Sequence, residues 1–209
     1  MSRILFPQVV FIIFMCVCYV FLKCRADKNN NTKKFANTCA ILLIIYISAM
    51  VYLVAGDRQG AVECGLELTP FESYKLVLTK YNSVDILVQI YQNILLFIPL
   101  GILLPETLFL RGKKFTSPLV VLLGSFVSFV IELAQFTYSI GYSEADDIIN
   151  NTLGCAIGCG VFFFADKVSV DSDGIRLKRG WLYGLLPAVV VVGIMAGIVM
   201  YREAILFHL

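Results

Sequence analysis

The sequence is poor in charge and almost free of histidine. Only 15% of its 209 residues are charged, against about 25% in soluble domains, and the single histidine is His208, next to the last residue. Hydrophobic residues make up 59% of the chain, and the mean hydropathy is +0.83. A soluble fold of this size could not cover so much apolar surface, so the expected solvent is lipid. The lack of histidine argues against His-based catalysis, and a net charge of +2 is too small to indicate nucleic-acid binding.

The seven cysteines do not form a metal-binding pattern. Most of them lie in apolar runs, where a free cysteine is usually a small packing residue. Cys155 and Cys159 have helical spacing, but no histidine or further cysteine stands nearby to complete a metal site. The sequence therefore predicts no metal site and no cofactor.

Six segments are long and apolar enough to cross a bilayer, which takes about 20 residues per helix. They are 4–22, 35–55, 84–110, 118–138, 147–165 and 181–201. The fifth begins with Asp147, Asn150 and Asn151, so five spans are the alternative. The predicted fold class is an all-α, polytopic membrane helical bundle with about six transmembrane helices.

The distribution of basic residues predicts the orientation of this bundle. The first apolar run has about 19 residues, longer than the 7–15 of a signal peptide, which favours a retained helix. Most Lys and Arg residues lie in three loops, at 23–34, 111–117 and 166–180. The positive-inside rule places these loops in the cytoplasm. Both termini and the segments 56–83 and 139–146 are then expected outside a cell membrane.

Polar side chains recur at one depth of three neighbouring predicted spans. Ionisable and amide groups in a bilayer are costly, so their clustering predicts a polar pocket open to the outside. The predicted binding residues are Asn93, Glu132, Gln135, Asp146, Asp147 and Asn151. The alternative is that such groups only tie helices together, at roughly 0.6–2 kcal/mol per hydrogen bond. That interpretation is favoured for Ser125 and Ser128.

Prolines and glycines in these spans predict structural roles. Pro99 lies in the middle of the third span and should kink it, which frees the carbonyl of Leu95. Gly101 would let another helix approach beyond the kink. Gly154 and Gly158 form a small-xxx-small pair suited to close helix contact.

Four motifs, "LELTPF", "NILLFIPLGILLP", "IELAQF" and "DDIINNTLGCAIG", give a resemblance to a known family. In order and spacing they resemble the VanZ-like membrane family, over about residues 65–162. Many members carry an Arg shortly before the acidic pair, whereas this chain has Gly141-Tyr142-Ser143 there. The resemblance implies a VanZ-like core at 35–165, preceded at 1–34 by a helix and basic loop. A second basic loop and helix follow it at 166–209.

The resemblance also implies an accessory factor in resistance to the lipoglycopeptide teicoplanin. Three functions remain open. The first is a non-catalytic envelope factor whose polar pocket binds an amphiphile, either a lipid-linked cell-wall precursor or the lipoglycopeptide, in contact with membrane lipids. The second is a membrane enzyme with Glu132 or Asp147 as general acid or base. The third is a permease, which is disfavoured because no polar residues continue into the inner halves of these spans.

Overall fold

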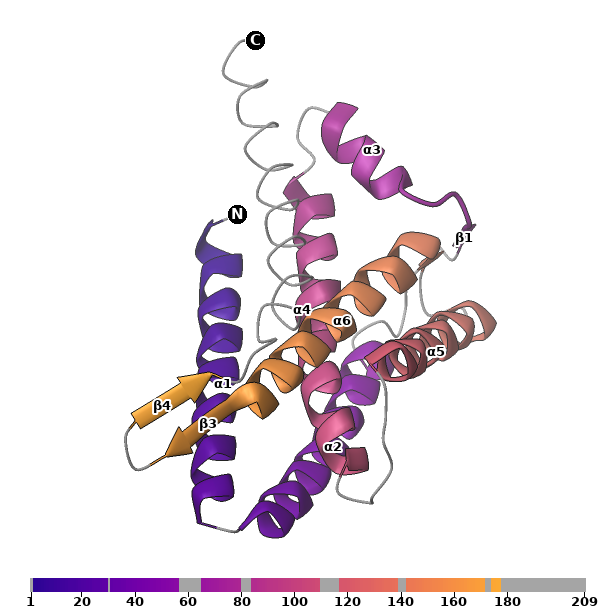
Figure 1. Ribbon diagram of the computed structural model, residues 1–209. Helices are drawn as coiled ribbons and strands as arrows, with labels where there is room; N and C mark the ends of the chain where they lie inside the picture. The colour runs from indigo at the N-terminus through magenta and orange to yellow at the C-terminus, as the bar shows by residue number, and fades with distance from the viewer. Residues whose placement is uncertain are drawn as a thin grey trace, which may run out of the picture.

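The computed structural model is a bundle of long helices whose outer and lateral edges carry short strands (Figure 1). It describes residues 2–29, 31–56, 65–79, 84–109, 117–138, 142–171 and 174–177. The sixth predicted span, 181–201, lies outside these residues. The other five predicted spans each correspond to one long helix, with bounds that differ by a few residues.

The helices are named in chain order. They are α1 (Ser2–Lys28), α2 (Thr32–Gly56), α3 (Glu72–Thr79), α4 (Val84–Phe109), α5 (Ser117–Thr137) and α6 (Ala145–Lys167). Within the described residues searched, four helices are long and apolar enough to cross a membrane, namely α2, α4, α5 and α6. These helices confirm a helical membrane protein, while the expected number of six spans stays a prediction.

The segment expected to lie at the membrane interface contains a strand and a short helix, which an all-α fold did not predict. Strand β1 (Gly65–Glu67) pairs in parallel with β2 (Tyr142–Glu144), with Leu66 opposite Ser143. Because β2 leads directly into α6, this pairing places the "LELTPF" segment over the start of that helix. A second pair, β3 (Val168–Asp171) and β4 (Gly174–Leu177), is an antiparallel hairpin after α6.

Helices α4 and α6 cross at the centre of the bundle and form its most extensive helix pair (Figure 1). A Cβ atom at Gly154 would meet the backbone carbonyl of Ile94, and one at Gly158 would meet that of Ile98. The Cα atom of Gly101 lies 3.0 Å from the Cβ position of Gly158. At these glycines, backbone is therefore packed against backbone.

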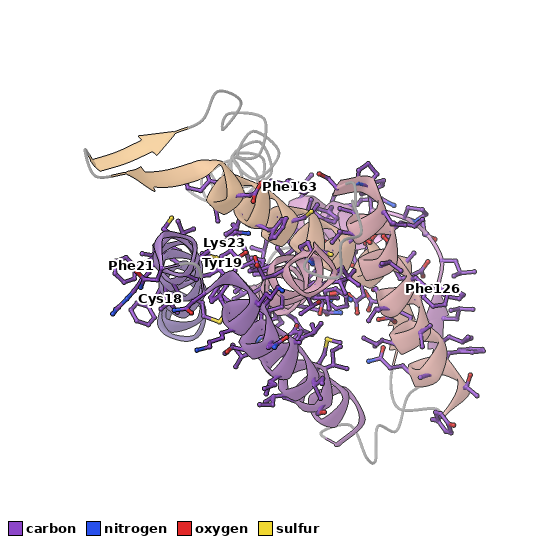
Figure 2. All side chains as sticks on the ribbon, turned by 60° about the horizontal axis from the view of Figure 1, so that its bottom comes forward. Cys18, Tyr19, Phe21, Lys23, Phe126 and Phe163 are labelled. Atoms are coloured by element: carbon purple, nitrogen blue, oxygen red, sulfur yellow. The ribbon has the colours of Figure 1, made fainter. Side chains whose placement is uncertain are left out.

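The outer faces of the bundle are apolar, as expected for surfaces that meet lipid. Exposed large hydrophobic side chains run along α1, α2 and α5. Figure 2 shows Phe21 and Phe126 pointing away from the bundle, whereas Tyr19 and Lys23 turn into it.

The sequence suggested that Lys23 is a base in a loop. In the structure it is instead a buried residue of α1. The helix continues to Lys28, and Lys23 is only 3% exposed. Its Nζ lies 2.8 Å from an oxygen of Glu106, which also accepts a 2.6 Å hydrogen bond from the Tyr19 hydroxyl. The ammonium also sits 4.2 Å from the centre of the Phe162 ring. A charge needs such partners when it leaves water, so this cluster fixes α1 against α4 and α6.

The glycine contact predicts that one added methyl group destabilises the bundle. Gly158→Ala should lower the melting temperature in detergent, because the methyl meets a backbone carbonyl that cannot move aside. Overpacking of this kind costs about 1–3 kcal/mol, whereas Ala in a helix otherwise gains about 1 kcal/mol over Gly. Val130→Ile, which adds a methylene to an exposed side chain of α5, is the control. Equal melting temperatures for Gly158→Ala and wild type would show that the close contact is absent.

The buried ion pair predicts a non-additive pair of substitutions. Lys23→Met should destabilise the protein by about 3–5 kcal/mol, because Glu106 is left as an unpaired buried charge. Adding Glu106→Gln removes that charge, keeps an acceptor for Tyr19, and should recover part of the loss. The control is Lys75→Met in the exposed pair of Lys75 with Glu72, where little change is expected. Denaturation of the purified variants measures this, and additive losses in the double variant would contradict the pairing.

Candidate functional site

The polar side chains predicted on three helices meet at one end of the bundle. Asn93 of α4 donates a hydrogen bond from Nδ2 to Oδ1 of Asp147 on α6. Asp147 lies about two turns of α6 before Gly154, where the two backbones are in close contact. The tight α4–α6 packing is thus the reason that the amide and the carboxylate meet.

Helix α5 supplies the third wall through a single buried stripe of side chains. Ser128, Glu132 and Gln135 are all buried, and they are spaced so that they share one helix face. Ser128 accepts a 2.9 Å hydrogen bond from Nδ2 of Asn151. The Ser128 contact, together with the 2.8 Å contact of Ser125 with Thr152, agrees with the interpretation that these serines join helices.

Glu132 links this stripe to the β1–β2 strand pair. One of its carboxylate oxygens accepts a 3.2 Å hydrogen bond from the backbone N–H of Glu144 in β2. Glu132 therefore connects the β1–β2 strand pair to the polar cluster. The carboxylate is buried, and the strand that it contacts leads directly into α6.

Asp146 takes a different place from the other predicted binding residues. Its two oxygens accept backbone hydrogen bonds from Phe71, at 2.5 Å, and from Ser73, at 2.7 Å. The carboxylate thereby caps the first turn of α3, the end at which a negative charge is favoured. Phe71 adopts a left-handed conformation, with φ of 64°, which is uncommon for a residue other than glycine. Asp146 thus binds the start of α3 and does not line the cavity.

Helix α3 is also bonded to α6 through Tyr74. Its hydroxyl donates a hydrogen bond to Oδ1 of Asn150 on α6. Burial, followed by the nearby charge of Asp146, raises the pKa of Tyr74 to about 12. The phenol therefore stays protonated and remains a donor throughout the physiological pH range.

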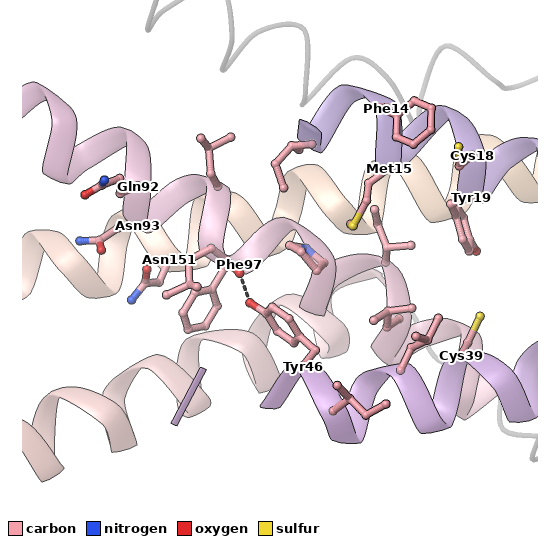
Figure 3. Close-up of a pocket in the computed structure, with 18 of the residues that line it drawn as sticks. Phe14, Met15, Cys18, Tyr19, Cys39, Tyr46, Gln92, Asn93, Phe97 and Asn151 are labelled. Atoms are coloured by element: carbon pink, nitrogen blue, oxygen red, sulfur yellow. Dashed lines mark hydrogen bonds between the residues drawn. The ribbon is translucent and has the colours of Figure 1, made fainter. Parts of the chain in front are cut away.

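The polar cluster forms one end of a cavity of about 1020 Å³ between α1, α2, α4, α5 and α6. This volume lies at the upper end of the range for ligand pockets. Its polar lining consists chiefly of Gln92, Asn93, Glu132, Gln135, Asp147 and Asn151. In Figure 3, Gln92, Asn93 and Asn151 lie at one end, and Cys18, Tyr19 and Cys39 lie at the other. Five of the six predicted binding residues thus line one cavity, and Asp146 is the exception.

The proline of α4 lies on the wall of this cavity. Pro99 is in the interior of the helix, which continues on both sides of it. The carbonyl of Leu95 was expected to be the free acceptor. The hydroxyl of Tyr46 instead donates a hydrogen bond to the carbonyl of Leu96 (Figure 3). A tyrosine of α2 thus meets the backbone one residue closer to the proline than predicted.

Two buried amide atoms in the described part of the site have no hydrogen-bond partner. They are Nδ2 of Asn150 and Oδ1 of Asn151. Asn151 lines the cavity and is 4% exposed, so its oxygen is available to a bound donor. Within the described residues, no three His, Cys, Asp or Glu side chains converge in a way suited to a metal ion.

Several residues of this arrangement were not found from the sequence. Tyr19, Lys23 and Glu106 form the buried ion-pair cluster, and Tyr46 reaches the proline region. An isolated carboxylate within the apolar run "GILLPETLFL" was a signal for Glu106. Nothing in the sequence around Tyr46 distinguished it from an ordinary lipid-facing aromatic residue.

Comparison with known proteins identifies the family of this chain. Protein VanZ of Enterococcus faecium is 28% identical to the chain over 128 residues, which cover 60% of this chain and 74% of the relative. No solved structure matches the chain. The model of the VanZ/LLP1 family matches residues 8–166. This match includes α1 and α2, which the four motifs at 65–162 had left out. The chain therefore belongs to the VanZ/LLP1 family.

Proposed function

We propose that this membrane protein is an accessory factor in teicoplanin resistance that binds an amphiphile at the outer leaflet. The amphiphile would place its polar end against Glu132, Asp147 and Asn151, and its chain between α1, α2 and α4. A lipid-linked wall precursor and the lipoglycopeptide itself are the two ligands considered. Resistance is inferred from the family, and binding is inferred from the cavity.

The observation that carries this proposal is the division of one cavity into a polar end and a long apolar part. Amide and carboxylate groups from three helices gather at one end, and the remainder is lined by aliphatic, aromatic and sulfur-containing side chains. Ligand pockets in proteins have this composition, mostly apolar with a few convergent polar groups. A pocket with a separate polar end matches a molecule that is itself polar at one end.

The same cavity also supports access from the bilayer. Phe14, Leu22, Leu42 and Ile45 line it and are each about half exposed or more. These residues belong to α1 and α2, so the rim faces the side of the bundle that meets lipid chains. An amphiphile can enter there sideways without leaving the membrane.

The polar end of the cavity predicts which substitutions abolish resistance. In a teicoplanin-susceptible bacterial host, Glu132→Gln, Asp147→Asn and Asn151→Ala should each lower the resistance conferred by wild type. Asp85→Asn is the matched control, because Asp85 is an exposed carboxylate of α4 that does not line the cavity. The measurement is the inhibitory concentration of the drug at equal membrane levels of each variant. Full resistance in all three variants would show that the cavity is not the functional site.

Envelope lipids from the same strains separate binding from catalysis. Binding alone predicts an unchanged lipid profile by mass spectrometry in wild-type and variant strains. A lipid species that appears or disappears with Asp147 would contradict it and establish the enzyme alternative, with a carboxylate as acid or base.

Access from the outer leaflet predicts that the segment 57–64 is outside the cell. An impermeant maleimide should therefore label Cys64 in intact cells, and a Cys64→Ser variant is the control for the other cysteines. The six described cysteines are buried or only partly exposed. Labelling that requires permeabilised membranes would indicate the reverse orientation, with the polar end of the cavity at the inner leaflet.

A further inference from the structure

The charge of the cavity lining distinguishes between classes of polar head group. We propose that the cavity selects an amphiphile whose polar end carries a protonated amine, an inference that rests on the proposed amphiphile-binding function. Two lining side chains are carboxylates, Glu132 and Asp147, and four are amides. Among the described lining residues there is no Lys, Arg or His. The charge at this end of the cavity is therefore of one sign.

A buried acceptor at the same place gives an independent indication. Oδ1 of Asn151 has no hydrogen-bond partner, although Nδ2 of the same side chain is bonded to Ser128. A buried polar atom is normally paired, and leaving it unpaired costs free energy. The atom that is open to a ligand here is thus an acceptor, and an ammonium group offers three donors.

The positions of the three acceptor side chains, Glu132, Asp147 and Asn151, suit a single small cation. Asp147 and Asn151 are four residues apart on α6, so they lie on the same helix face. Glu132 comes from the facing side of α5, whose Ser128 holds the Asn151 amide. An ammonium at this end can donate hydrogen bonds to oxygens of both helices, and hydrogen bonds that involve a charge are the stronger ones.

The apolar part of the cavity fits the chain of a membrane amphiphile. From Asn93 to Leu103, both of which line the cavity, α4 rises about 15 Å. This is about half of the roughly 30 Å hydrocarbon thickness of a bilayer, and hence close to one leaflet. An acyl chain that follows α4 can therefore be enclosed while its head stays at the acidic end.

A head group joined through phosphate does not suit this lining. Its oxygens would meet carboxylates of the same charge, and phosphate sites in proteins are instead built from Arg, Lys or helix N-termini. The cavity thus disfavours a phosphate-linked wall precursor as the direct occupant. It favours an acyl-bearing molecule with a free amine.

Three amphiphiles that share one chain test this selection. The full-length protein is purified in detergent, and the retention of hexadecylamine, hexadecanol and hexadecyl phosphate is measured by native mass spectrometry. The wild type should retain the amine at least about tenfold better than the alcohol or the phosphate. Neither of these two has an ammonium group that could donate a charged hydrogen bond to the carboxylates. The double variant Glu132→Gln/Asp147→Asn should reduce the retention of the amine to that of the alcohol. Asp85→Asn should leave all three unchanged.

Two further controls separate the head group from the chain and from misfolding. Cys18→Phe narrows the apolar part of the cavity and should lower the retention of all three amphiphiles alike. Gln and Asn keep one acceptor oxygen each, so the double variant retains the hydrogen bond to Asn93 and should melt close to wild type. A variant that melts much lower is replaced by the single substitution Glu132→Gln, with the same expected direction.

The possible results are distinct. Equal retention of amine and alcohol by wild type would overturn the selection of an amine and leave amphiphile binding intact. Preference for the phosphate, with or without added Mg²⁺, would overturn it in the opposite direction. If the folded wild type retains none of the three, amphiphile binding itself fails, and the selection of an amine fails with it.

Discussion

The close approach of α4 and α6 is the constraint on which the rest of the structure depends. Gly154 and Gly158 pack against the backbone carbonyls of Ile94 and Ile98, at positions where any side chain would collide. Without a hydrophobic force between helices in lipid, this kind of van der Waals contact is what drives their association. About two turns nearer the start of α6, the same approach brings Asn93 to Asp147. The glycines therefore set the distance at which the polar end of the cavity forms.

The polar groups at this end of the bundle then have two tasks. Asp146 and Asn150 hold α3 against α6, and Glu132 on α5 binds the backbone of β2. Asp147 and Asn151 share one face of α6 and line the cavity together with Glu132. At the far end of α4, Glu106 pairs with Lys23 and fixes α1, which forms part of the apolar wall. The cost of each buried charge is thus offset by a contact that positions a helix.

The sequence predicted the long helices and most of the site because both rest on local patterns. Apolar length predicted the spans, and helical spacing predicted the shared faces of Glu132 with Gln135 and of Asp147 with Asn151. The remaining features depend on partners distant in the chain. Asp146 and Asp147 are adjacent and chemically alike, and only the position of α3 assigns one to capping and the other to the cavity. Lys23 likewise looked like a loop base until the extent of α1 and the location of Glu106 were known.

The central claim is that an amphiphile occupies the cavity with its chain along α4. The most direct measurement is photolabelling of the full-length protein with hexadecylamine that carries a diazirine at the chain end, followed by peptide mapping. The account predicts labels at the apolar end of the cavity, on Cys18, Tyr19 or Leu103, that an excess of unlabelled hexadecylamine removes. Labels confined to the exposed face of α5, at Phe126 and Phe129, would contradict it, because those side chains are more than half exposed and do not line the cavity.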